Sequence, residues 1–169
     1  MVYKTLLTLV AMSTAANAAQ GSTRVSEINA LFIIPFLLFS MYGGFLADRF
    51  SKRSVTTGTK LLEVAVMLLA TLAAWMGSLD LGMAALFLLG TQAALFGPAK
   101  YGILPELLPE TRLSWGNGIL EMTTFLSIIL GTVVGGLLAE GLRGRLHVAG
   151  ILLIGLALAG VVSSRRITR

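Results

Sequence analysis

Two charged side chains stand in or beside long apolar runs of the sequence. Glu121 lies within the apolar run 115–139, and Lys100 directly follows the run 81–99. A charge at the centre of a bilayer costs about 2.5–3.5 kcal/mol, so such residues are first treated as functional. A lysine ammonium binds phosphate and a carboxylate binds an ammonium, so the two residues suit a zwitterionic ligand. Two alternatives stay open: a structural salt bridge between helices, and a lysine that extends to the membrane surface.

Four further polar residues lie in apolar runs. Lys60 and Glu63 are three residues apart and can pair along one helix face, which we interpret as structural. Asn29 and Gln92 can line a binding cavity or form hydrogen bonds between helices, and the sequence leaves both open. We keep Asn29 and Gln92, with the first two charged residues, as candidate substrate-binding residues.

No pattern typical of an enzyme is present in the sequence. It has no cysteine and a single histidine, His147, and its eight acidic residues are spread along the chain. A metal site needs several such ligands at close spacing, and neither a nucleophile–base pair nor a glycine-rich phosphate loop occurs. We therefore expect no catalytic residue, no metal, no cofactor and no enzymatic activity.

The composition is that of an integral membrane protein. Of the 169 residues, 56% are hydrophobic and 12% are charged, against about 45–50% and 25% in soluble domains. The mean hydropathy is +0.86. Roughly a third of the surface of an unfolded chain of this size stays wet after folding, so a soluble fold could not bury so much apolar surface. The basic residues lie between apolar runs, where they contact lipid head groups rather than nucleic acid.

The apolar runs predict an all-α membrane protein with six transmembrane helices. A hydrocarbon core of about 30 Å needs roughly 20 helical residues; five runs meet this clearly, and polar residues dilute the first. The predicted helices cover residues 3–19, 28–47, 57–76, 81–99, 115–139 and 146–162. The first run has an alternative, because Ala16-Asn17-Ala18 is also typical of a signal-peptide cleavage site.

The lysines and arginines predict the orientation of these helices. Cytoplasmic loops carry an excess of both residues. With a cytoplasmic amino terminus, the inner loops 48–56 and 100–113 hold many of them, and only Arg24, Arg143 and Arg145 fall outside. We therefore predict that both termini are cytoplasmic. The predicted outer loops are 20–26, 77–80 and 140–146.

Two segments of the sequence, 92 residues apart, are alike. Residues 43–53 read GGFLADRFSKR, and residues 135–145 read GGLLAEGLRGR. Three helices separate the copies, so the second is inverted in the membrane. This predicts an inverted repeat of three plus three helices, as in the halves of secondary transporters; a chance likeness of two glycine-rich helix ends is the alternative. Gly131 and Gly135 are also predicted to form a helix packing face.

The first copy carries a charge cluster at the end of a helix. Asp48 is followed by the cations Arg49, Lys52 and Arg53. A cluster that forms and breaks is the bistable element that alternating access needs. The alternative is a membrane anchor, which the three cations would provide in any case.

Several stretches resemble a known family of membrane proteins. Residues 44–53 look like the loop signature G-x-L-A-D-R-x-x-R/K-R of the major facilitator superfamily. More specific stretches are FGPAKYGILPE at 96–106, NGILE at 117–121, TFL at 124–126 and LGT at 130–132. These resemble the lysophospholipid transporter family within that superfamily, which includes the flippase portion of acyltransferase fusions. The resemblance runs from about residue 31 to about residue 139.

The resemblance implies a function and a gate. The function is inward movement of lysophospholipids, such as lysophosphatidylethanolamine, across a bacterial inner membrane for re-acylation. The gating loop consists of Gly44, Asp48, Arg49, Lys52 and Arg53.

The resemblance also implies partners for the chain. Family members begin helix 1 with an acidic Asp-Asn element and carry a second six-helix half. We therefore expect residues 1–169 to form the amino-terminal half of a transporter, with the carboxy-terminal half missing and an acyltransferase as a further partner. Two alternatives are an exporter of drugs or small solutes of the same superfamily, and a membrane anchor module of an acyltransferase.

Overall fold

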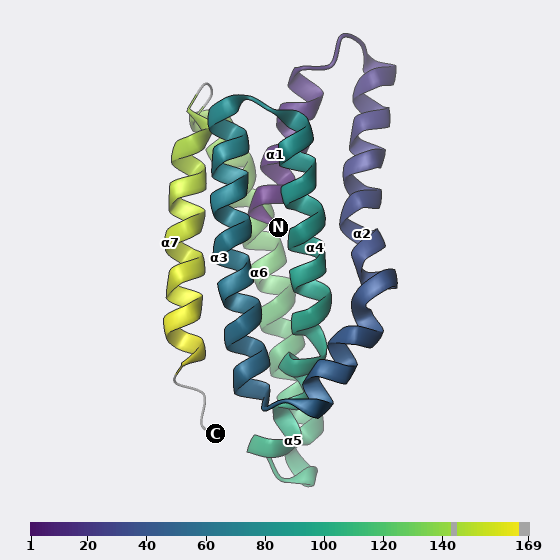
Figure 1. Ribbon diagram of the computed structural model, residues 1–169, viewed down its shortest axis with the longest axis vertical. Coiled ribbons are helices and arrows are strands. Elements are labelled where there is room, and N and C mark those ends of the chain that lie inside the picture. The colour runs from purple at the N-terminus through teal and green to yellow at the C-terminus, as the bar shows by residue number, and fades with distance from the viewer. Residues whose placement is uncertain (143–144, 166–169) are drawn as a thin grey trace.

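The computed structural model describes residues 1–142 and 145–165, which form a bundle of long helices (Figure 1). This confirms the predicted all-α fold. Arg143, one of the arginines of the predicted outer side, lies outside the described residues. So do Arg166 and Arg169, which lie on the predicted cytoplasmic side with the carboxy terminus. The helices are α1 (Val2–Ser13), α2 (Ala18–Arg49), α3 (Lys52–Met76), α4 (Leu79–Gly102), α5 (Leu104–Leu107), the 3-10 helix η1 (Glu110–Arg112), α6 (Leu113–Gly141) and α7 (Leu146–Ser164).

Five helices of the described part are long and apolar enough to cross a membrane. They correspond to the predicted helices from 28–47 onward, with α5 and η1 inside the predicted loop 100–113. The first predicted helix, 3–19, is wrong in length. Its counterpart α1 has 12 residues, about 18 Å at 1.5 Å per residue, and its amino-terminal end lies part-way along the bundle in Figure 1.

A capping arrangement fixes where α1 ends and α2 begins. The side chain of Asn17 accepts a hydrogen bond from the backbone N–H of Gln20, 2.8 Å away, and the Gln20 side chain accepts one from Ala16, 2.7 Å away. Such reciprocal bonds satisfy the free N–H groups at a helix start. Helix α2 thus begins at Ala18, so the predicted outer loop 20–26 is helical instead.

Reciprocal contacts between glycine and proline hold α2 against α4. A Cβ built on Gly90 would lie 2.8 Å from the carbonyl oxygen of Phe32 and 3.1 Å from Cγ of Pro35. A Cβ on Gly43 would likewise lie 3.3 Å from Cγ of Pro98. Small residues permit such close backbone approach in membranes. Helix α2 carries Pro35 in its interior and bends along its length (Figure 1), as the hydrogen bond lost at a proline predicts.

The two predicted repeats make equivalent contacts. Helix α2 packs on α4, and α6 packs on α1. A Cβ on Gly43 would lie 2.6 Å from the carbonyl oxygen of Ala94, and a Cβ on Gly135 would lie 3.0 Å from that of Val2. Gly43 and Gly135 are 92 residues apart, and so are Val2 and Ala94. The same contact therefore occurs twice between the repeats, each time from the second helix of one repeat to the first helix of the other, as the inverted repeat predicts.

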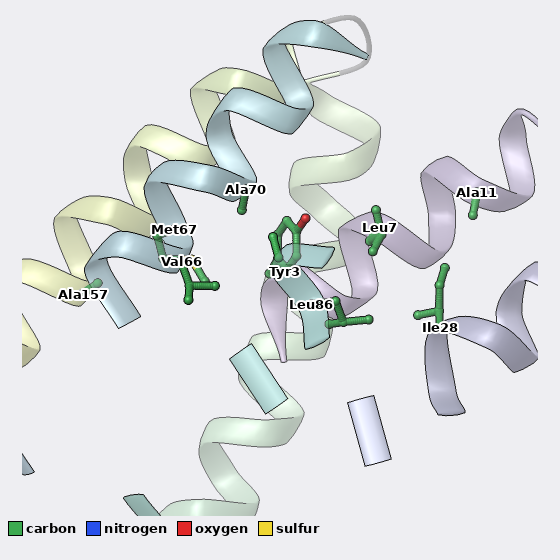
Figure 2. Packing of buried hydrophobic residues seen from close by; sticks show 10 residues of the cluster. Tyr3, Leu7, Ala11, Ile28, Val66, Met67, Ala70, Leu86 and Ala157 are labelled. Atoms are coloured by element: carbon green, nitrogen blue, oxygen red, sulfur yellow. The ribbon is translucent and has the colours of Figure 1, made fainter. Parts of the chain in front are cut away.

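Most of the helices share one core, and α6 stays at its edge. Tyr3 and Leu7 of α1 pack with Met67 of α3 and Leu86 of α4 in this core, and Figure 2 shows Tyr3 among these side chains. The Tyr3 hydroxyl donates a hydrogen bond to the carbonyl oxygen of Gly82, 2.9 Å away. This packing makes α1 a part of the bundle. By contrast, only glycines of α6 are buried, and its large apolar side chains face outward.

Candidate functional site

Lys100 and Glu121 come together where α4 ends against α6. The ammonium of Lys100 donates a hydrogen bond to the hydroxyl of Thr124, 2.6 Å away, and lies 5.5 Å from the centre of the Tyr101 ring. The carboxylate of Glu121 accepts a hydrogen bond from the Tyr101 hydroxyl. Each charge therefore has a neutral hydroxyl as its partner.

This arrangement leaves both charges able to bind a ligand. In the described part of the chain, the ion pairs are Lys52–Glu106 and Lys60–Glu63. Lys100 and Glu121 are thus not joined in the salt bridge that the sequence left open as an alternative. An ammonium has three donors and a carboxylate accepts about four hydrogen bonds, so each group retains capacity for a phosphate or an ammonium.

Sequence reasoning missed the two hydroxyl partners, Tyr101 and Thr124. Both stand in the stretches that resemble the transporter family, at 96–106 and 124–126. Thr124 is three residues after Glu121, which places both on one face of α6. That spacing could have identified Thr124, whereas the hydrogen bond of Tyr101 depends on how α4 crosses α6.

Gln92 belongs to a separate polar cluster inside the bundle. Lys60 and Glu63 form the predicted pair on α3, with 2.7 Å between Nζ and Oε2. Gln92 of α4 is 5% exposed, and its amide donates to the same carboxylate oxygen at 3.5 Å. Gln92 lies eight residues before Lys100, about 12 Å along the helix. The structure thus gives Gln92 an interhelical hydrogen bond away from the Lys100 site.

Asn29 lies apart from both groups of residues. Its amide nitrogen donates a hydrogen bond to the carbonyl oxygen of Val25, 2.9 Å away, within the same helix α2. The side chain is half-buried. In this conformation the amide nitrogen of Asn29 is bonded to the backbone of its own helix.

Lys52 is the residue of the predicted gating loop with the most contacts. Its ammonium donates to the carbonyl oxygen of Ala47, at the end of α2, and lies 3.9 Å from Oε1 of Glu106 on α5. A Cβ on Gly102 would lie 3.0 Å from Cε of Lys52, so this side chain also lies against the end of α4. Lys52 therefore joins the ends of three helices at one end of the bundle.

The other residues of that loop are more loosely held. Asp48 is exposed, and it takes part in neither ion pair of the described residues. Arg49 lies 5.9 Å from the ring centre of Phe45, and Arg53 is half-buried. Gly44 has open space where a Cβ would stand. In this conformation Lys52 is held by Glu106 rather than by Asp48.

Comparison with known proteins assigns the chain to a family. Residues 1–167 match the family model of the Major Facilitator Superfamily. The chain therefore belongs to the major facilitator superfamily, a family of transporters rather than enzymes, and it is a multi-pass membrane protein.

Individual members of the superfamily are also similar to this chain in sequence. The chain is 34% identical over 141 residues to the "Lysophospholipid transporter LplT" of Cronobacter sakazakii, covering 81% of this chain and 32% of that protein. It is 36% identical over 116 residues to the proteins of the same name from Escherichia coli K12 and Shigella boydii, covering 67% of this chain and 27% of each. The chain thus spans about a third of the length of these relatives. No solved structure matches it significantly.

Proposed function

We propose that this chain is part of a transporter that moves lysophospholipids across a membrane by alternating access. The observation that carries the proposal is the Lys100–Glu121 site, where an ammonium and a carboxylate lie at one helix junction without pairing. A lysophosphatidylethanolamine head group presents a phosphate and an ammonium, which are the complementary charges. The printed name of the relatives, lysophospholipid transporter, supports the same cargo.

Uptake by cells distinguishes a lysophospholipid transporter from the alternative within the superfamily, an exporter of drugs or small solutes. Cells that produce the full-length protein are expected to take up labelled lysophosphatidylethanolamine faster than cells without it. An exporter of drugs or small solutes would instead lower the retention of such compounds and leave lysolipid uptake unchanged. That second outcome would show that the cargo is a drug or small solute and not a lysophospholipid.

We also place the protein in a bacterial inner membrane, with the Lys52 end of the bundle in the cytoplasm. Support comes from the cations near this end: Arg49, Lys52, Arg53, Lys100 and Arg112. Lysine and arginine are retained on the cytoplasmic side. Delivery of a lysolipid to this side would make it available for re-acylation, so an acyltransferase is the expected partner. We further propose a second six-helix half, which would cover the apolar outer face of α6.

This orientation predicts the labelling of single cysteines, which the cysteine-free chain permits without background. Ser51→Cys in the turn between α2 and α3 is expected to resist an impermeant thiol reagent added outside intact cells. Ala16→Cys is the matched control, because it is exposed in the turn between α1 and α2 at the opposite end of the bundle. It is expected to react from outside. If the reagent labelled Ser51→Cys and not Ala16→Cys, the proposed orientation would be wrong, and the Lys52 end of the bundle would face the outside.

We propose that the loop around Lys52 acts as the gate on this side. Lys52→Gln removes the ion pair with Glu106 and the cationic contact with the end of α2. Exposed ion pairs are worth about 0.2–1 kcal/mol, so lysolipid uptake is expected to change by up to about fivefold, since 1.4 kcal/mol is tenfold. Arg49→Gln is the matched control, because Arg49 contacts only Phe45 among the interactions described above. If both variants changed lysolipid uptake equally, the gate would be rejected, and the cations of this loop would act only as membrane anchors.

A further inference from the structure

A cavity lies at the opposite end of the bundle from Lys100. Its volume is about 440 Å³, and residues of α1, α3, α4 and α7 enclose most of it. Leu7, Met67 and Leu153 are among the apolar side chains of its wall. The cavity reaches from the helix ends near the turns 14–17 and 77–78 down to Tyr3, whose ring lies in the core shown in Figure 2.

Opposite charges line the cavity at its outer end. Arg24 of α2 is half-buried, and its guanidinium donates a hydrogen bond to the Thr14 hydroxyl, 3.1 Å away. Asp80 stands in the first turn of α4 and is exposed. Arg24, Thr14 and Asp80 all line the cavity, and we call this polar end its mouth. A guanidinium retains several donors beside one bond to a hydroxyl, so Arg24 can still bind an anion.

We infer that this cavity binds a zwitterionic phospholipid with a single acyl chain. The acyl chain occupies the apolar interior, the phosphate contacts Arg24, and the ammonium of the head group contacts Asp80. Guanidinium groups bind phosphate with two parallel hydrogen bonds, and a carboxylate is the natural acceptor for an ammonium.

The volume of the cavity favours one chain over two. A methylene group is similar in size to a water molecule, whose share of liquid volume is about 30 Å³, so the cavity, whose volume includes the polar mouth, holds at most about 15 such groups. This is the length of one ordinary acyl chain. A phospholipid with two chains would leave the second outside, in contact with the polar mouth or with the bilayer.

The mouth is separated from the Lys100 site by the thickness of the membrane. Asp80 and Lys100 are 20 residues apart on α4, about 30 Å at 1.5 Å per residue, which equals the hydrocarbon core. The inference rests on the proposed function in one respect, the cargo. It adds a binding site on the far side of the membrane, where a lysolipid from the outer leaflet would enter.

Photo-crosslinking tests the site without requiring transport. The full-length protein in lipid nanodiscs is exposed to lysophosphatidylethanolamine that carries a photoreactive group in its acyl chain, and labelled peptides are identified. Crosslinks are expected on the cavity segments of α1 and α7. Ala74→Phe fills the cavity from α3 and is expected to reduce these crosslinks at least tenfold. Ala65→Phe is the matched control, because Ala65 is exposed on the same helix, and it is expected to keep them.

Two substitutions at the mouth keep the test valid if Ala74→Phe unfolds. Arg24→Gln is expected to weaken labelling by any lysophospholipid, whereas Asp80→Asn is expected to weaken only labelling by the ethanolamine lipid and not by lysophosphatidylglycerol. Crosslinks that are unaffected by these three variants, or that diacyl phosphatidylethanolamine competes away as well as the lysolipid, would overturn the inference. Labelling of the cavity in a protein that shows no lysolipid uptake would support the binding site and overturn the proposed function instead.

Discussion

Replacing Gly43 by alanine is expected to lower the free energy of unfolding of the bundle by about 1–3 kcal/mol, the usual cost of overpacking. The added Cβ would lie 2.6 Å from a backbone carbonyl oxygen of α4, which cannot move aside as a flexible side chain could. Gly44→Ala is the matched control, because open space surrounds that position. It should be neutral or stabilising by up to about 1 kcal/mol, since alanine favours helix over glycine.

The repeat predicts the same contrast on α6. Gly135→Ala is expected to destabilise, because its Cβ would lie 2.9 Å from Cβ of Thr5. Gly136→Ala is expected not to, because no atom lies within 4 Å of that position. Unfolding of the purified protein in detergent, followed by circular dichroism, measures all four variants. Equal stability of Gly43→Ala and Gly44→Ala, or of Gly135→Ala and Gly136→Ala, would contradict the close backbone contacts of Gly43 and Gly135.

The second large effect is expected at Glu121. Glu121→Gln in the full-length protein should reduce uptake of lysophosphatidylethanolamine by about 10- to 100-fold, because a hydrogen bond to a charged group is worth about 1.5–3 kcal/mol. Uptake of an anionic lysolipid should change much less, since it presents no ammonium. Glutamine still has an oxygen that can accept the hydrogen bond from Tyr101, so the local packing is kept.

Lys100→Gln is expected to impair every lysolipid that carries a phosphate. Its amide can still donate to Thr124, so the variant isolates the charge. Because the two residues have separate hydroxyl partners, the double variant should show additive free-energy losses rather than rescue. Suppose that Glu121→Gln reduced uptake of all lysolipids equally and that the double variant restored uptake. Both residues would then have a structural role and would not bind the substrate. Protein levels are measured in parallel, because failed insertion would mimic lost uptake.

Much of the fold follows from the sequence because a bilayer imposes simple rules. The length of the hydrophobic core and the need to satisfy every backbone hydrogen bond fix the number and type of the long spans. Gly135, which the sequence predicted to lie on a helix packing face, does meet a neighbouring backbone, and so does Gly43 at the equivalent position of the repeat. The sequence did not predict the contact of Gly43, which depends on where α4 packs.

Other features depend on contacts that no spacing reveals. The end of α1 is set by the capping of α2 through Asn17 and Gln20, in a segment whose small residues also suit a cleavage site. Lys100 and Glu121 were identified because ions are rare in apolar runs, but their hydroxyl partners depend on the crossing of α4 and α6. The loop cations likewise indicate a charged helix end, whereas the choice of Glu106 over Asp48 by Lys52 depends on where α5 packs.

Movement of a lysolipid by the purified protein is the most direct test of the proposed transport. The full-length protein is reconstituted into liposomes, and fluorescent lysophosphatidylethanolamine in the outer leaflet is followed by an impermeant quencher. The lysolipid is expected to move to the inner leaflet only when the protein is present, with little movement of the diacyl lipid and a much slower rate for Glu121→Gln. A rate equal to that of protein-free liposomes, for a protein whose folded state is verified by its unfolding transition, would contradict the proposed transport.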